Sequence, residues 1–251
     1  MACLKNLLSG NNWKFRQAGT EKWMKAFVPG CVHKDLLRNN LIPDPFFGLN
    51  EKKVWWIENE DWEYKLDFRL PKGYKRFPFC ELQFEGLDTF AEVWLNGKHV
   101  LSSDNMFIPH HINVTAILKK GNNILEVTFR SPYKTPLKEY NKLNYVLPAN
   151  NDKGEKRVSP FARKAPYMYG WDWGPRLLTS GLYKDVRLIC FDSIRFLDIH
   201  SEIQELTEKW AAIVIHFEAE NLRKGEYEIH VTCDGKKVAG KRLNLDPGIV
   251  R

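Results

Sequence analysis

The sequence lacks every short motif that marks a self-contained active site. It contains no G-x-S-x-G nucleophile turn, no H-E-x-x-H zinc motif, no P-loop and no G-x-G-x-x-G dinucleotide turn. Each of these motifs is the local geometry that its chemistry needs, so their absence argues against an α/β-hydrolase, a zinc protease, a P-loop NTPase and a Rossmann dehydrogenase. We therefore expect no metal and no cofactor in this chain.

Cysteine is scarce, and long apolar runs are missing. The five cysteines are an odd number without a C-x-x-C spacing, which predicts small buried thiols rather than a disulfide framework or a metal site. No apolar run approaches the roughly 18 residues of a membrane span. Residues 1–10 hold no signal-peptide core, which predicts a cytoplasmic protein, or a periplasmic or secreted one if a signal was removed before this numbering begins.

The sequence also lacks a concentration of charge of either sign. Its net charge is +7, but 38 basic residues are spread among 31 acidic ones. Scattered lysines solvate a surface, whereas nucleic-acid binding needs a basic stripe, so we expect no nucleic-acid partner. The pair His110-His111 lies in a strand-like stretch, where adjacent side chains point to opposite faces and cannot share a metal.

What the sequence has in plenty is aromatic side chains in strand-like alternation. Residues 62–70 and 80–85 alternate apolar with polar side chains, which is typical of antiparallel strands with one solvated face. Asn96-Gly97 is a strong hairpin signal between two further strands. More strands are expected at residues 107–117, 124–130 and 183–191.

Three segments of the first two hundred residues depart from this pattern. Apolar spacing over residues 32–37 predicts a short helix. Residues 41–50 carry two prolines and a glycine, which predicts a loop packed by its own Phe46 and Phe47. Residues 131–168 have no regular pattern and are too long for an idle connection, so we expect an ordered loop that delivers the stretch after it to a rim.

Beyond Asp192 a new set of strands begins. They are expected at residues 194–200, 210–220, 227–233 and 236–245. Three or four strands are fewer than the roughly seven of an immunoglobulin-like sandwich, so this part is expected to be incomplete, with no closing strand in its last residues. We predict an all-β fold with a first domain over residues 1–191 and a second over residues 192–251.

The most unusual stretch is Tyr167–Arg176, which reads YMYGWDWGPR. Four rings, one carboxylate and one guanidinium share it with two glycines and a proline, which favours a shaped loop over a helix or strand. Rings stack on the apolar face of a pyranose while polar side chains bind its hydroxyls, so the stretch is typical of a sugar-binding wall. The alternative is that its tryptophans only pack against a core edge.

Carboxylates that could perform glycoside hydrolysis are hard to find. The reaction needs two of them facing each other, about 5–5.5 Å apart for retention. The Asn-Glu pairs at 50–51 and 59–60 lie in polar loop contexts and are interpreted as surface charge. Asp172 differs, because two rings flank it and lower the local dielectric. It is a candidate acceptor for sugar hydroxyls, but one carboxylate does not make a hydrolase.

Five stretches of the sequence carry a family resemblance. They are VPGCVH (28–33), EGLDTFAEVWLNGKHV (85–100), DNMFIPHHINVT (104–115), KKGNNILEV (119–127) and RKAPYMYGWDWGPRLLTSGLYKDVRL (163–188). Together they resemble the N-terminal part of glycoside hydrolase family 2, over essentially residues 11–191. The hairpin run and VPG-H are shared broadly in that family, whereas WDWGP with the preceding Arg-Lys indicates its β-mannosidase branch.

The resemblance implies a galactose-binding-like jelly-roll sandwich for the first domain and a partial immunoglobulin-like sandwich for the second. In such enzymes a (β/α)₈ barrel follows and carries both catalytic glutamates, which have no matching positions here, so no catalytic residue is expected and the chain is expected to be inactive alone. Asp172 matches the aspartate that holds non-reacting hydroxyls of the sugar. The remaining predicted substrate-binding residues, expected mainly to shape and anchor the loop, are Trp171, Trp173 and Arg176.

Three functions remain open. The preferred one is the non-catalytic N-terminal region of a β-mannosidase, whose intact form removes terminal mannose from mannosides or manno-oligosaccharides by retaining double displacement and whose partner is the missing barrel. The second is a stand-alone carbohydrate-binding module. The third is a purely structural domain, in which the rings of residues 167–173 pack on the barrel and leave an apolar patch exposed in its absence.

Overall fold

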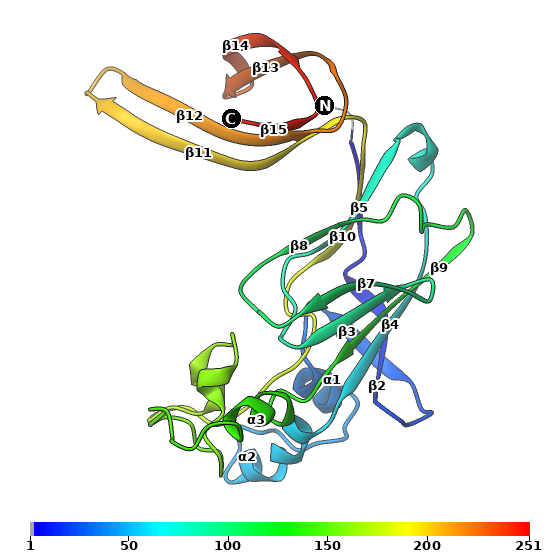
Figure 1. Ribbon diagram of the computed structural model, residues 1–251, viewed down its shortest axis with the longest axis vertical. Coiled ribbons are helices and arrows are strands. Elements are labelled where there is room, and N and C mark those ends of the chain that lie inside the picture. Colours follow the sequence, from blue (N-terminus) through cyan, green and yellow to red (C-terminus); the bar gives the residue numbers. More distant parts are fainter. Residues whose placement is uncertain (1–2) are drawn as a thin grey trace. The chain divides into compact units, whose positions relative to one another are not determined.

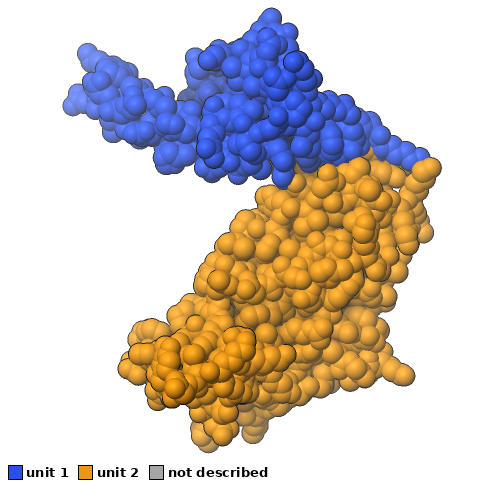
Figure 2. Space-filling view, viewed as in Figure 1, with its two compact units in different colours: residues 1–4, 75–79, 190–251 blue, residues 5–74, 80–189 orange. Residues whose placement is uncertain are grey.

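The computed structural model describes residues 3–251, which are built mainly from antiparallel strands. The chain divides into two compact units (Figures 1 and 2). Of the described residues, the larger unit holds 5–74 and 80–189, and the smaller one holds 3–4, 75–79 and 190–251. The prediction of an all-β fold is confirmed.

A six-stranded antiparallel sheet forms much of the larger unit, in the order β3-β2-β4-β9-β6-β7. Its strands are β2 (Gly10–Gln17), β3 (Met24–Val28), β4 (Trp62–Arg69), β6 (Ala91–Leu95), β7 (Lys98–Ser103) and β9 (Asn122–Phe129). Strand β4 buries Trp62, Tyr64, Leu66 and Phe68, as its alternation predicts. The ring of Trp62 stacks on Phe15 of β2 with centroids 5.9 Å apart. Aromatic side chains therefore form much of the core on this face.

The predicted hairpin at Asn96-Gly97 joins β6 to β7. Both residues have positive φ, 56° and 79°, which is the backbone of a type I′ turn. The Asn96 side chain adds specificity, because its Nδ2 donates to the Ile117 carbonyl oxygen at 2.9 Å and its Oδ1 accepts from the Ile124 N–H at 3.0 Å. The Asn96 side chain thus also bonds the turn to the backbone at Ile117 and at Ile124 of β9.

A second antiparallel sheet has the order β1-β10-β5-β8. Its strands are β1 (Cys3–Leu7), β5 (Phe79–Phe84), β8 (His110–Asn113) and β10 (Val186–Phe191). Strand β8 is shorter than the expected strand over residues 107–117. The side chain of Asn105 accepts from the Phe107 N–H at 2.9 Å, and that of Asn113 accepts from the Thr115 N–H at 3.1 Å. These Asx turns limit the strand at both ends.

The cysteines depart from the prediction of five buried thiols. Cys80 and Cys190 are disulfide-bonded, and they lie in the neighbouring strands β5 and β10. Cys3, Cys31 and Cys233 are free. The two bonded residues are buried in apolar strands, as their context predicts. The disulfide was not predicted because the spacing of cysteines in the sequence does not show which distant strands become neighbours.

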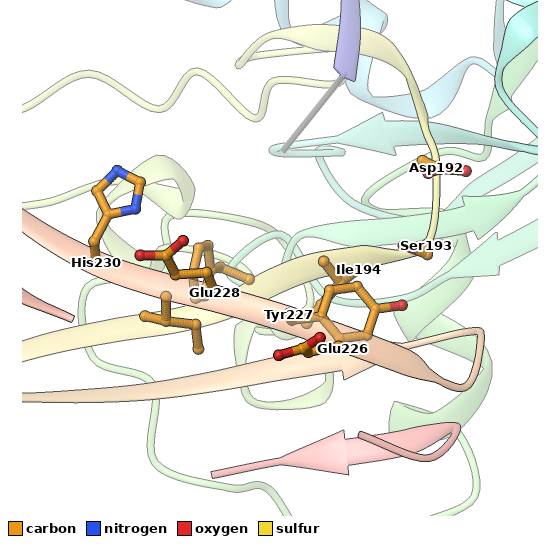
Figure 3. A pocket seen from close by; sticks show the side chains of 9 residues that line it. Asp192, Ser193, Ile194, Glu226, Tyr227, Glu228 and His230 are labelled. Carbon is orange, nitrogen blue, oxygen red and sulfur yellow. The ribbon is translucent and has the colours of Figure 1, made fainter. Parts of the chain in front are cut away.

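The smaller unit holds a three-stranded sheet, β11-β12-β15, and a two-stranded sheet, β13-β14. The strands are β11 (Ile194–Leu206), β12 (Ala211–Asn221), β13 (Gly225–Cys233), β14 (Lys236–Leu245) and β15 (Gly248–Val250). The expectation that the last residues lack a closing strand is wrong, because β15 pairs with residues 219–221 of β12. A pocket of about 490 Å³ in this unit is lined by residues 192–194, Phe196 and residues 226–230, and none of the predicted site residues lines it (Figure 3).

Short helices lie between strands β3 and β10 in the sequence. They are α1 (Val32–Arg38), α2 (Asn50–Lys53), α3 (Lys134–Tyr140) and the 3-10 helices η1 (Trp55–Asn59), η2 (Tyr74–Arg76), η3 (Ser159–Phe161) and η4 (Pro166–Tyr169). Helix α1 was predicted, and α3 was not. Ser131 lies three residues before α3, and its Oγ accepts from the N–H of Lys134, the first residue of the helix, at 2.8 Å.

The loop after α1 differs from its prediction in one respect. Phe46 and Phe47 do not pack the loop, because they are 75% and 77% exposed. The loop is held by polar contacts instead: Asp44 Oδ1 accepts from the Phe46 N–H at 3.0 Å, and the Asp44 carbonyl oxygen accepts from Asn50 Nδ2 at 3.0 Å. The two rings are therefore free to contribute to a surface.

Candidate functional site

The aromatic loop, Tyr167–Arg176, starts in η4 and turns at Gly170. Gly170 has a φ of 114°, and a Cβ at this position would lie 2.8 Å from Cγ of Lys153 and 3.0 Å from the Asn151 carbonyl oxygen. Glycine is the residue that tolerates both the backbone conformation and the close approach. The local sequence therefore sets the point where the chain turns outward.

A small hydrophobic cluster lies beneath the aromatic loop. Its fully buried members are Val158, Tyr169 and Leu178, and the side chains packed on them are Tyr133, Leu137, Tyr140, Ala162 and Met168. Most of these residues belong to the irregular segment 131–168, which is thus ordered around its own core. The Tyr169 hydroxyl also donates to the Pro132 carbonyl oxygen at 3.4 Å. One end of the aromatic loop is thereby fixed from below.

Arg176 fixes the other end of the loop. Its side chain is 1% exposed, with Nη2 donating to Glu58 Oε1 at 2.8 Å and Nη1 donating to Asp152 Oδ1 at 2.7 Å. Nη1 also donates to the Tyr169 carbonyl oxygen at 3.0 Å, and the Arg176 N–H donates to Glu51 Oε1 at 2.7 Å. A buried guanidinium needs such partners, and here they connect four segments of the chain. Arg176 therefore acts on the loop from its buried side.

The acidic partners of Arg176 were not identified from the sequence. Glu51 was interpreted as surface charge, yet it accepts a hydrogen bond from the backbone of the loop. Burial raises the pKa of the Glu58 carboxyl above its ordinary value, and Arg176 partly offsets this. Asp152 also accepts from the Gly154 and Ser159 N–H groups at 2.9 and 3.0 Å. The sequence could have indicated that a buried arginine would need acidic partners, but no local pattern indicates which residues these are.

The tip of the aromatic loop is exposed. Trp173 is 83% exposed, and Trp171 is half-buried and meets it edge to face with ring centroids 5.5 Å apart. Asp172 lies between them in the chain, is exposed, and makes no hydrogen bond or ion pair with any part of residues 3–251. The structure thus brings two rings and one free carboxylate together on the surface and keeps Arg176 apart from them.

A groove of about 610 Å³ runs beside this tip. It is lined by Phe46, Pro166, Tyr167, Met168, Trp171, Trp173, Gly174, Pro175, Leu177 and Thr179. Thr179 supplies the one side-chain hydroxyl apart from that of Tyr167, and Asp172 is not part of the lining. The groove therefore offers stacking surface and little hydrogen bonding, so a sugar held here would need polar partners from elsewhere.

The described residues show no other arrangement with obvious chemistry. Across residues 3–251, no three side chains of His, Cys, Asp or Glu are grouped so that they could hold a metal ion. No helix in that range is long and apolar enough to cross a membrane. The aromatic loop and its groove are therefore the candidate site of the larger unit.

The comparison with protein families gives a match over most of the chain. The model for the glycosyl hydrolase 2 galactose-binding domain-like family matches residues 13–184, which includes the aromatic loop. This chain belongs to that family. The resemblance to glycoside hydrolase family 2 noted from the sequence is thereby confirmed.

Relatives of this family-2 chain include curated and solved β-mannosidases. It is 38% identical over 246 residues to β-mannosidase B of Thermothelomyces thermophilus and 34% identical over 256 residues to β-mannosidase B of Neosartorya fischeri. These alignments cover 94% and 98% of the chain but 27% and 30% of the relatives. The crystal structure of a β-D-mannosidase from Dictyoglomus thermophilum matches with a TM-score of 0.85 and 40% identity, over 100% of this chain and 30% of that one. The chain thus spans about 30% of the length of these proteins.

Proposed function

We propose that this chain is the N-terminal, non-catalytic region of a β-mannosidase-type glycoside hydrolase. In this proposal residues 1–191 are the galactose-binding-like jelly roll, and residues 192–251 are part of an immunoglobulin-like sandwich. The intact enzyme removes terminal non-reducing β-mannose with retention, and its two catalytic carboxylates lie outside these 251 residues. Support comes from the similarity to β-mannosidases over nearly the whole chain.

The aromatic loop is proposed to form one wall of the sugar subsite. The observation that carries this role is the placement of Asp172, an unpaired carboxylate at the exposed tip of a loop whose base is buried and hydrogen-bonded. A carboxylate accepts hydrogen bonds from two adjacent hydroxyls, and Trp171 and Trp173 offer apolar faces beside it. Asp172 then binds non-reacting hydroxyls, and bonds that strengthen in the transition state raise the rate without any chemistry by Asp172 itself.

Replacement of the carboxylate tests this role. In the uninterrupted protein that carries this chain, Asp172→Ala should lower kcat/KM for an aryl β-mannoside by about 10²-fold or more, because charged hydrogen bonds to the sugar and its orientation are lost together. Asp172→Asn, which keeps the shape and removes the charge, should fall between Ala and the parent protein. Steady-state kinetics give the values, and the thermal unfolding midpoint should stay unchanged because Asp172 bonds to no other side chain or backbone group in the described part of the chain.

Asp234 is a suitable control. It is an exposed aspartate in the turn between β13 and β14, far from the aromatic loop in sequence. Asp234→Asn removes a negative charge while leaving the loop intact, so kcat/KM should match the parent protein. An Asp172→Ala protein with parental kcat/KM would exclude the proposed subsite.

A further inference from the structure

A second buried cation lies at the base of the aromatic loop. The side chain of Lys164 is fully buried and its Nζ donates to Asp88 Oδ1 and, at 2.9 Å, to the Thr179 carbonyl oxygen. The Thr179 hydroxyl donates to Asp88 Oδ2 at 2.6 Å, and the Thr89 hydroxyl donates to Asp88 Oδ1 at 2.6 Å. Both oxygens of the Asp88 carboxylate are thus bonded without solvent.

This network joins the two stretches of chain that flank the aromatic loop. Lys164 precedes Tyr167, and Thr179 follows Arg176. The backbone groups of Asp88 and Gly181 exchange two further hydrogen bonds of 2.9 Å each. The segments just before and just after the aromatic loop are therefore both bonded to the Asp88 carboxylate.

We propose that Lys164 and Asp88 are positioning residues for Asp172, an inference that rests on the proposed function of the aromatic loop. Asp172 has no partner of its own among residues 3–251, so the place of its carboxylate is set by the groups that hold the loop. Arg176 with Glu58 and Asp152 holds one side of the base, and Lys164 with Asp88 holds the other. A displacement of about 1 Å at a binding group is enough to lower a rate about 10²-fold. Breaking the Lys164–Asp88 network should therefore lower activity by displacing the Asp172 carboxylate from the sugar.

If the Lys164–Asp88 ion pair were purely structural, its removal should lower activity in a different way. A buried pair of this kind often contributes little net stability, and removal of one partner destabilises the fold wherever the pair lies. Such a loss would lower activity independently of Asp172. The two explanations separate in a double-mutant cycle, because residues that act through one another give non-additive effects.

The test compares Lys164→Met in two backgrounds of the uninterrupted protein, with an aryl β-mannoside as substrate. With Asp172 present, Lys164→Met should lower kcat/KM by about 10- to 10²-fold. In the Asp172→Ala background the same substitution should lower it by less than about 3-fold, because there is no carboxylate left to position. Effects that multiply in the double mutant would overturn the positioning role. An unchanged kcat/KM in Asp172→Ala alone would instead overturn the proposed function.

A second variant and a second measurement cover the case in which Lys164→Met does not fold. Asp88→Asn with Lys164→Met removes both buried charges, and it should reproduce the kinetic loss and its dependence on Asp172. Hydrogen exchange measured on the 251-residue chain should accelerate over residues 170–175 and stay unchanged in β4 and β9. Parental exchange in that loop would contradict the inference.

The neighbour of Lys164 in the sequence provides a matched control. Arg163 forms an exposed ion pair with Asp104, with Nη1 and Oδ2 2.8 Å apart. Arg163→Met removes one positive charge from the adjacent position without opening a buried network, so it should leave kcat/KM and loop exchange at parental values. Leu125→Ala, in the core of β9, controls for general destabilisation and should lower the unfolding midpoint without a selective change in the loop.

Discussion

His33 is a buried histidine at the start of α1 whose Nδ1 atom has no hydrogen-bond partner among the residues that the structure describes. Burial and the nearby charge of Lys164 lower its pKa to about 4, while Asp88 acts in the opposite direction. The folded chain therefore keeps His33 neutral at pH values where the unfolded chain takes up the proton.

We predict that His33 makes the stability of the chain sensitive to acid. Because the folded pKa lies below the ordinary 6.5, the destabilisation is absent above about pH 6.5 and grows as the pH falls toward 4. The shift corresponds to roughly 3 kcal/mol. In His33→Leu, the free energy of unfolding should fall less between pH 7 and pH 4 by about that amount, as measured by urea unfolding at a series of pH values.

The exposed His216 of β12 is the control for this experiment. His216→Leu removes one exposed imidazole and should keep the steep parental dependence on pH. If His33→Leu and the parent protein had the same slope between pH 7 and pH 4, the imidazole of His33 would not be the acid-sensitive group.

At the scale of elements, the turn at Gly170 gives a further prediction. Gly170→Ala places a Cβ against Lys153 and Asn151 at a φ of 114°, so the loop must shift or the chain must accept strain of about 1–3 kcal/mol. We expect a lower unfolding midpoint and, in the uninterrupted protein, a lower kcat/KM for a mannoside. Differential scanning calorimetry and steady-state kinetics measure the two effects.

Gly121 offers the matched comparison for Gly170. It has no positive φ and open space where a Cβ would lie. Gly121→Ala should therefore leave the midpoint unchanged or raise it by reducing the entropy of the unfolded chain. Equal behaviour of the two variants would mean that the turn at Gly170 is not strained by a side chain.

Elements with a local signal were predictable from the sequence. Alternation located β4, and Asn96-Gly97 located the hairpin between β6 and β7, because a half-buried strand and a type I′ turn impose their pattern on neighbouring residues. Helix α3 was not predicted because it contains Pro136 and is too short to show a regular apolar period. Strand β15 was not predicted because three residues are too few to show an alternation of apolar and polar side chains.

At the scale of the whole molecule, contacts between distant residues limited what the sequence could predict. The loop tip at residues 171–173 was identified from composition, but its anchors were not. Glu58 lies 118 residues before Arg176, and Asp88 lies 76 residues before Lys164. Such ionic pairs are created by the tertiary fold, so neither residue carries a local mark of its role.

The polar groups available around the groove also bear on whether the chain is a region of an enzyme or a stand-alone carbohydrate-binding module. A sugar site needs several polar groups converging on the ligand, and within residues 3–251 the lining of the groove holds the hydroxyls of Tyr167 and Thr179 and no carboxylate. We therefore expect the 251-residue chain to show no saturable binding of mannose or mannobiose at millimolar concentrations, in calorimetric titrations and in spectra of the indole protons. Binding at or below about 1 mM that disappears in Trp173→Ala would identify a module instead, because the exposed ring would then be holding a sugar without any help from a barrel.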